Sequence, residues 1–182
     1  RELRAHGGNL FGGVCINLLR HPAWGRAQET YGEDPFLLGE MGVALTRGVQ
    51  HHNVVATPKH FAANSMENAR FHVDVSVDER ALREVYLPHF KRCIDAGAGA
   101  VMSAYNKVNG SFCGHSYELL TRILKEEWGF DGFVYSDFIL GCRSADAFGA
   151  GLDVEAPDTI RFGEKLAEQI RDGAISKERL DD

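Results

Sequence analysis

Short apolar runs and longer stretches of helical periodicity alternate along this chain. Five runs predict β-strands: GVCINL at 13–18, NVVAT at 53–57, GAVMSAY at 99–105, GFVYSD at 132–137 and AGLDVEA at 150–156. In the fourth run, Phe133, Val134 and Tyr135 favour strands and lack polar alternation, which predicts a strand covered on both faces, as in a parallel sheet flanked by helices. The run ends on Asp137, which is either the N-cap of a following helix or a reactive group facing a cavity.

Local signals mark where the helices begin and end. Asp34 followed by Pro35 is typical of a helix start, and Asp78 is predicted to cap the next helix. Pro88 is expected to kink that second helix, and Gly97 to end it. Helices are predicted at 34–52, at 78–97, at 116–129, directly after Asp137 and at 158–172.

Strands that alternate with helices indicate right-handed βαβ units and a parallel sheet, either doubly wound or closed as a (β/α)8 barrel. No strand is followed by a GxGxxG or GxxxxGK motif, which disfavours nucleotide binding. A (β/α)8 barrel normally needs about 200 residues or more and eight strands. From 182 residues and five predicted strands, we expect an α/β fold that is a partial TIM-like barrel with parallel strands, about five of its eight βα units being present.

Composition argues against several partners. A net charge of −6 and a pI of about 5.7 give no footprint for nucleic acid or an anionic membrane, because phosphate binding needs clustered Lys and Arg. No apolar run is long enough to span a bilayer. The four cysteines lack metal-ligand spacing and are predicted to be reduced packing thiols. Because the chain begins at Arg1 without a methionine, we expect an upstream segment in the full protein.

Polar side chains follow four of the predicted strands at the point where each strand ends. Reactive groups gather at the carboxyl ends of strands in both candidate folds, so these side chains are expected to face one pocket. Fixed hydrogen-bond donors beside an aromatic platform suit a ligand rich in hydroxyl groups. A nearby cation is expected to lower the pKa of Asp137 and keep it ionised, as a nucleophile requires. The residues are Arg20, Arg26, Lys59, His60, Tyr105 and Asp137.

Each of these residues also has a purely structural explanation. The two arginines could pair with nearby acidic residues on the surface, the lysine could be solvated, and the histidine could be a hydrogen-bonded core residue. Convergence at four successive strand ends favours the functional explanation, because unrelated surface residues would not all lie at one end of the sheet.

Five motifs in chain order resemble those of family 3 glycoside hydrolases. They are RHPAWGRAQETYGEDP, KHFAAN, VMSAYNKVNG, EWGFDGFVYSDF and AGLDVEAP, and the resemblance runs from about residue 8 to the end of the chain. Members typically have a (β/α)8-like N-terminal domain followed by an α/β sandwich domain, and most release sugars from non-reducing ends with retention of configuration. The resemblance implies that residues 1–182 are an internal part of the N-terminal catalytic domain, with the second domain absent from this chain.

The resemblance also implies residue roles. The Asp of the SDF stretch is the family's nucleophile, here Asp137, and the sugar in the cleaved subsite would be bound by Arg26, Lys59, His60 and Tyr105. Arg20, Asn64 and Glu67 match motif positions that would support this site. Members commonly carry Trp after the nucleophile, whereas this chain has Phe138, a milder aromatic platform.

The function implied is that of a retaining, exo-acting glycosidase. The KHFAANSMENAR stretch lacks the Gly-His extension typical of members that act on N-acetylglucosamine, which favours a β-glucosidase-like or β-xylosidase-like enzyme. It would remove a terminal β-linked sugar, glucose first and xylose as the alternative, through a glycosyl-enzyme intermediate on Asp137. The acid/base Glu is expected from the second domain, and Glu33, Glu67 and Asp153 are not assigned to that role. No metal or cofactor is implied.

Two other functions stay open at this point. The chain could be a non-catalytic carbohydrate-binding or inert fragment, and on its own it is expected to be inactive even if its parent is an enzyme. A Schiff-base aldolase barrel, in which Lys59 attacks a carbonyl, is the less favoured alternative. The expected partners are an oligosaccharide or glycoside and the remainder of the protein's own chain, with no nucleic acid or membrane.

Overall fold

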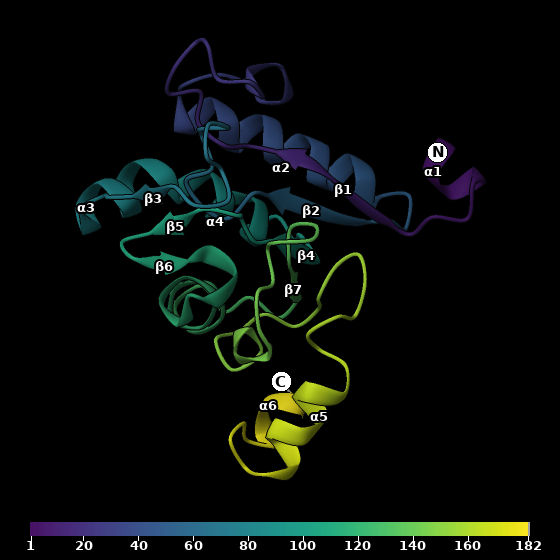
Figure 1. The fold of residues 1–182 in the computed structure, drawn as a ribbon. Helices are drawn as coiled ribbons and strands as arrows, with labels where there is room; N and C mark the ends of the chain where they lie inside the picture. The colour runs from purple at the N-terminus through teal and green to yellow at the C-terminus, as the bar shows by residue number, and fades with distance from the viewer. Residues whose placement is uncertain (182) are drawn as a thin grey trace.

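Parallel strands form the centre of the computed structural model, which describes residues 1–181. The strands are β1 (Leu10–Cys15), β2 (Val55–Lys59), β4 (Ala100–Met102) and β7 (Phe133–Tyr135). β1 pairs with β2 and β4 pairs with β7, both in parallel, and a parallel bridge between Phe61 and Ser103 joins the two pairs. These strands lie in the same order in space as along the chain (Figure 1), the arrangement that successive βαβ units produce.

The prediction of an α/β fold with parallel strands is confirmed, but the run at 150–156 does not form a strand of its own. Its only strand-like contact within residues 1–181 is a parallel bridge between Val154 and Tyr135. The N–H groups of Asp153 and Val154 both donate to the carbonyl of Val134, at 2.8 and 3.0 Å. Because two donors share one acceptor, the regular ladder does not extend along this run. The partial barrel with five βα units stays a prediction.

All four central strands differ from the predicted ranges: β4 and β7 are shorter, and β1 and β2 are displaced along the chain. β1 begins at Leu10 rather than residue 13, and its register shifts between Phe11 and Val14. This irregularity falls at the pair Gly12 and Gly13. β2 continues past the predicted end at residue 57, because Pro58 stays in the ladder opposite Val14.

The first two predicted helices form with their predicted caps. The N–H of Phe36 donates to the Asp34 side chain at 2.9 Å, where α2 (Pro35–Gln50) begins. Asp78 accepts from the N–H of Ala81 at 2.9 Å and starts α3 (Glu79–Ala81). The helical path then continues through a π-helical turn, η2 (Leu82–Tyr86), and restarts at Pro88 as α4 (Pro88–Asp95). The predicted kink at Pro88 is confirmed.

The later helices depart further from the prediction. The third is the π-type helix η4 (Glu118–Glu127). No helix begins after Asp137, where residues 138–140 form a turn, and the next helical turn is η5 (Ala145–Ala147). That prediction was wrong, and with it the N-cap explanation of Asp137. The last, α5 (Glu164–Arg171), begins six residues later than predicted, because the buried Glu155 carboxylate accepts from the N–H groups of Arg161 and Phe162.

A small second sheet was not predicted. Its strands are β3 (Asp74–Val75), β5 (Lys107–Val108) and β6 (Ser111–Phe112). β5 and β6 form an antiparallel hairpin across Asn109 and Gly110, both with positive φ. An Asn-Gly pair in this conformation is the preferred two-residue hairpin turn, so the NG of the VMSAYNKVNG motif was the available signal. The remaining elements are α1 (Glu2–Ala5), η1 (Ala27–Glu29), η3 (Cys113–His115) and α6 (Glu178–Asp181).

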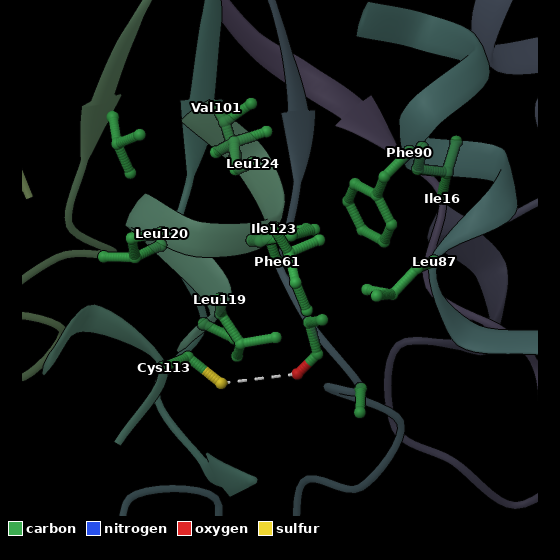
Figure 2. Packing of buried hydrophobic residues seen from close by; sticks show 14 of the residues in the cluster. Ile16, Phe61, Leu87, Phe90, Val101, Cys113, Leu119, Leu120, Ile123 and Leu124 are labelled. Carbon is green, nitrogen blue, oxygen red and sulfur yellow. Dashed lines mark hydrogen bonds between the residues drawn. The ribbon is translucent and has the colours of Figure 1, made fainter. Parts of the chain in front are cut away.

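One large apolar core joins the strands to the helices that cover them. Phe61 and Phe90 are almost fully buried, and their rings meet edge to face at a centroid distance of 5.2 Å. Leu119, Leu120 and Ile123 of η4 pack into the same cluster (Figure 2). The Cys113 thiol lies 3.5 Å from the Ala62 carbonyl there. All four cysteines are free and buried, as the prediction of packing thiols required.

A second, smaller apolar cluster forms from residues of β4 and β7 that are separate from the main core. It contains Ala100, Met102 and Tyr135, with Val55, Phe133 and Ala156 packed against them. Met102, Phe133 and Tyr135 also line the largest described cavity. The strands thus carry the main core and also form the wall of a cavity.

Candidate active site

The largest cavity described in residues 1–181, about 1030 Å³, is lined by residues of β1, β2, β4 and β7 and by residues that follow these strands. Seven of the nine predicted site residues line it: Arg26, Lys59, His60, Glu67, Tyr105, Asp137 and Phe138. They come from the segments that follow β1, β2, β4 and β7. Five of the six residues named from strand ends, all but Arg20, thus lie around one cavity.

The two remaining predicted residues, Arg20 and Asn64, do not line this cavity. The exposed Arg20 guanidinium lies over the Tyr86 ring of η2, 5.9 Å from the ring centre. The Asn64 side chain is 1% exposed, and its two amide atoms have no hydrogen-bond partner among the residues described. The supporting role of both residues stays a prediction.

Asp137 directly follows the buried Ser136 beyond β7 and is itself only 7% exposed. Its Oδ1 accepts from the N–H of Phe138 at 2.8 Å, which holds the carboxylate in one orientation. Its Oδ2 lies 3.6 Å from His60 Nε2 and has no hydrogen-bond partner within residues 1–181. A buried carboxylate oxygen left unsatisfied is unfavourable for folding, which is typical of a functional rather than a stabilising group.

The electrostatic environment of Asp137 differs from the prediction. Burial raises the pKa of this carboxyl above its usual value, and outweighs the other contributions. The Phe138 N–H, the nearby Tyr105 hydroxyl and the positive charges of Arg26 and Lys59 act in the opposite direction. The expected cations are present, but the predicted lowering of the pKa was wrong because desolvation was left out.

His60 is almost fully buried and bonded to Asn17. Burial, together with the positive charges of Arg26, Lys59 and Arg70, holds the pKa of this imidazole well below its usual value. His60 follows the last residue of β2, and the Lys59–His60 peptide bond is cis. The imidazole is therefore a neutral group beside the carboxylate of Asp137.

Three cationic side chains line the cavity: Arg26, Lys59 and Arg70. Arg26 forms two hydrogen bonds with Glu29, at 2.8 and 2.7 Å. Lys59 lines the cavity, and its ammonium group has no ion-pair or hydrogen-bond partner among residues 1–181. Arg70 pairs with Glu67 at 3.1 Å. Both arginines are thus paired with carboxylates, whereas the Lys59 ammonium group has no such partner in the described part of the chain.

Aromatic rings and Glu67 organise the position of Arg70. Its guanidinium stacks on the rings of Phe71 and Tyr105, 4.7 and 4.9 Å from their centres. The buried Trp24 indole donates to Glu67 Oε1 at 3.1 Å, while Glu67 Oε2 accepts from Arg70. Glu67 is thus structurally paired, as expected when it was not assigned the acid role.

Tyr105 lines the cavity with a hydroxyl that is already committed as a donor. It donates to the carbonyl of Phe138 at 2.7 Å. Burial, and then the negative charge of Asp137, raise the pKa of the phenol. The Phe138 side chain is 49% exposed at the cavity rim, so its ring is available to a ligand.

Sequence reasoning missed several residues of this site. Arg70, Glu29 and Gly25 line the cavity, and Trp24 and Asn17 hold other site residues in place. Arg70 lies within the KHFAANSMENAR stretch, where an arginine amid polar residues was a visible signal. Asn17 is a polar residue inside the apolar run GVCINL, which was a second signal.

The described part of the chain brings together no group of three or more His, Cys, Asp or Glu side chains able to hold a metal ion. Among residues 1–181, no helix has both the length and the apolar character needed to cross a bilayer.

Comparison with known proteins gives one consistent result. The model of the Glycosyl hydrolase family 3 N terminal domain matches residues 1–182. A beta-glucosidase of Rhizobium radiobacter is 43% identical over 181 residues, which cover 98% of this chain and 22% of that protein. A thermostable beta-glucosidase B of Acetivibrio thermocellus is 40% identical, with 98% and 24% covered. This chain thus spans about a quarter of the length of such relatives.

Solved structures show the same similarity. DesR, a beta-glucosidase from Streptomyces venezuelae in complex with D-glucose, superposes with a TM-score of 0.94 at 36% identity, covering 98% of this chain and 25% of that one. Beta-glucosidase 3B from Thermotoga neapolitana in complex with glucose gives a TM-score of 0.92 at 41% identity, covering 99% and 26%. With a family model that matches its full length and relatives at this identity, the chain belongs to glycosyl hydrolase family 3, as part of its N-terminal domain.

Proposed function

We propose that this chain is part of the catalytic domain of a retaining β-glucosidase, with Asp137 as the nucleophile. The observation that carries the proposal is the Asp137 carboxylate, which is buried in a polar cavity with one oxygen fixed by the Phe138 N–H and the other unpartnered among the described residues. A fixed carboxylate with a free oxygen is suited to attack on an anomeric carbon. Glucose is the sugar we favour, because the solved relatives named above include complexes with glucose.

The remaining cavity groups are suited to binding the sugar. Arg26, Lys59 and Arg70 offer N–H donors to hydroxyl groups, and the Tyr105 oxygen can accept because its proton is engaged with Phe138. The exposed face of Phe138 is placed to contact the leaving group at the rim. Polar groups that fix a hydroxyl-rich ligand beside apolar walls are the usual composition of such a pocket.

In the mechanism we propose, Asp137 forms a bond to the anomeric carbon while a second carboxylic acid donates its proton to the departing glycosidic oxygen. Water then releases the sugar, with the second residue acting as base. Retention requires the two carboxyl groups to lie about 5 to 5.5 Å apart. Glu29 and Glu67, which line the cavity, and Asp153 all form ion pairs within this chain. We infer that the acid lies in another part of the full protein.

The same reasoning covers the domain organisation. We infer that residues 1–182 are an internal part of a (β/α)8-like domain, whose remaining strands complete the sheet beyond β1 and Val154. A further α/β sandwich domain would supply the acid. Support comes from relatives about four times as long as this chain and from the cavity wall formed by apolar residues of the strands. No observation favours the aldolase alternative.

Covalent labelling tests the proposal in the full-length protein. A 2-deoxy-2-fluoro glucoside with a good leaving group should leave one sugar on the peptide that contains Asp137, because fluorine slows the second step more than the first. Asp137→Asn should abolish labelling and nearly all hydrolysis, whereas the exposed Asp131→Asn, two residues before β7, should label normally. Peptide mass spectrometry that finds the sugar on another residue would rule out this assignment.

A further inference from the structure

Asn17 and His60 are joined by three contacts that span 43 residues of sequence. Asn17 lies two residues beyond β1 and His60 one residue beyond β2, and the two strands pair in parallel with Cys15 opposite Lys59. The Asn17 amide donates through Nδ2 to the His60 carbonyl at 2.8 Å, and its Oδ1 accepts from the His60 N–H at 2.7 Å. The same Oδ1 lies 3.0 Å from His60 Nδ1.

The two backbone contacts determine which way the Asn17 amide points. A carbonyl oxygen can only accept and a backbone N–H can only donate, so the nitrogen of the amide must face the His60 carbonyl and the oxygen must face the His60 N–H. The amide is thereby oriented by groups whose roles are fixed. Because Oδ1 can only accept, the His60 Nδ1 beside it must carry a proton.

A neutral imidazole has one proton, so a proton on Nδ1 leaves Nε2 with a free lone pair. The charged groups that face this ring are Arg26, Lys59 and Arg70, from the segments after β1 and in and after β2, and Asp137, from the end of β7. The three cations and burial keep the imidazole neutral. Nε2 then faces Asp137 Oδ2 at 3.6 Å, as one acceptor opposite another.

We propose that Asn17 is a positioning residue that fixes the proton of His60 on Nδ1, so that Nε2 accepts a hydrogen bond from a sugar hydroxyl. This inference rests on the proposed function of Asp137. It also changes the role predicted for His60, from a donor to an acceptor.

The position of Nε2 indicates which hydroxyl it receives. If Asp137 Oδ2 contacts the reacting carbon, a group 3.6 Å from that oxygen is within reach of the hydroxyl on the adjacent carbon, which is the 2-hydroxyl. Both Nε2 and Oδ2 are acceptors there, so only a group that donates a proton is favourable between them. The site thereby selects a sugar with a free 2-hydroxyl.

The first test uses the unmodified full-length enzyme labelled with 15N in its histidines. Solid-state 15N spectra at neutral pH should show, for His60, a protonated Nδ1 and an unprotonated Nε2, with His60→Gln identifying its signals by their loss. A proton on Nε2, with or without one on Nδ1, would overturn the inference. Hydrolysis and Asp137 labelling in the same sample report separately on the proposed function.

The second test changes the protonation state of the His60 imidazole. Asn17→Asp keeps an accepting oxygen beside Nδ1 and adds a negative charge. This charge should favour the imidazolium, whose Nε2 is a donor, and the acid limb of the kcat/KM profile should rise by about one pH unit or more. Activity should be lost as pH falls through the raised pKa and recover above it. A variant that loses the same fraction of activity at every pH would mean that Asn17 is merely structural.

Asn109→Asp is the matched control for this variant. Asn109 makes the same pair of backbone contacts, accepting from the N–H of Val77 at 3.0 Å and donating to its carbonyl at 2.8 Å, without an imidazole beside it. The kcat/KM profile of Asn109→Asp should match that of the unmodified enzyme. An equal shift in the control would assign the effect to added charge rather than to His60, and would also overturn the inference.

Discussion

Asp153, unlike Asp137, has a structural role, and Asp153→Asn should lower stability without affecting catalysis. Asp153 Oδ2 accepts from the N–H of Val134 in β7, and Oδ1 accepts from Lys125 Nζ at 2.8 Å and from Arg179. The Asp153 and Lys125 side chains are 17% and 11% exposed. This carboxylate thus ties η4 and the C-terminal helix α6 to the central strands.

The expected size follows from the two charged contacts. Hydrogen bonds to charged groups contribute about 1.5 kcal/mol or more each, and an Asn at 153 could still accept from Val134. Losing two such contacts should lower the free energy of unfolding by about 3 kcal/mol. For a domain of about 150 to 250 residues, that corresponds to a fall of about 6 to 12 °C in the unfolding midpoint.

Differential scanning calorimetry of the full-length protein, following the transition of this domain, measures the change. The matched control is Asp95→Asn, which breaks an exposed i,i+4 pair with Lys91 and should lower the midpoint by only about 1 to 2 °C. The kcat of Asp153→Asn, measured well below the transition, should stay near that of the unmodified enzyme. A midpoint shift no larger than that of the control would refute the assigned role of Asp153.

Three further outcomes are expected. Burial raises the pKa of Asp137, so its ionised form destabilises the folded state, and Asp137→Asn should not lower the unfolding midpoint at pH 7. This destabilisation by the ionised carboxylate should disappear below pH 3.8, the usual pKa of the carboxyl group. A lower midpoint of the Asn variant at pH 7 would contradict the prediction. Lys59→Ala and His60→Ala should each reduce kcat/KM in the full-length enzyme by a factor equivalent to about 2 to 4 kcal/mol, whereas unchanged kinetics would make both residues structural. The isolated 182-residue chain should show only traces of aryl glucoside hydrolysis and should aggregate through exposed sheet edges; full turnover would disprove the fragment interpretation.

Features that depend on neighbouring residues could be predicted well. The caps at Asp34 and Asp78 and the break at Pro88 are confirmed, because each depends on backbone groups within a few residues. The failed predictions depended on contacts with residues outside the predicted element. The helix expected from residue 158 begins late because Glu155 binds the N–H groups of Arg161 and Phe162. The apolar run around Val154 becomes a single bridge because its donors converge on the Val134 carbonyl.

The same distinction applies to the site. Strand ends and motif positions predicted that His60 and Asp137 face one pocket, and both line the cavity. The sequence does not show how deeply Asp137 is buried, and this burial raises its pKa. Glu67 could be expected to pair with an arginine from the local NAR stretch, and it does pair with Arg70. Its second contact, to the Trp24 indole, joins segments 43 residues apart, which no local pattern indicates.

The protonation of His60 illustrates why a list of site residues is not yet a mechanism. A histidine can donate or accept, and the choice here depends on an amide that reaches it from the neighbouring strand. That contact requires the parallel register that brings Cys15 opposite Lys59, so a shift of one residue between β1 and β2 would remove it. The pairing of two strands thus determines which atom of His60 is free. Because that atom is Nε2, the strand register determines that a donating hydroxyl, the 2-hydroxyl of the sugar, is favoured beside the proposed nucleophile.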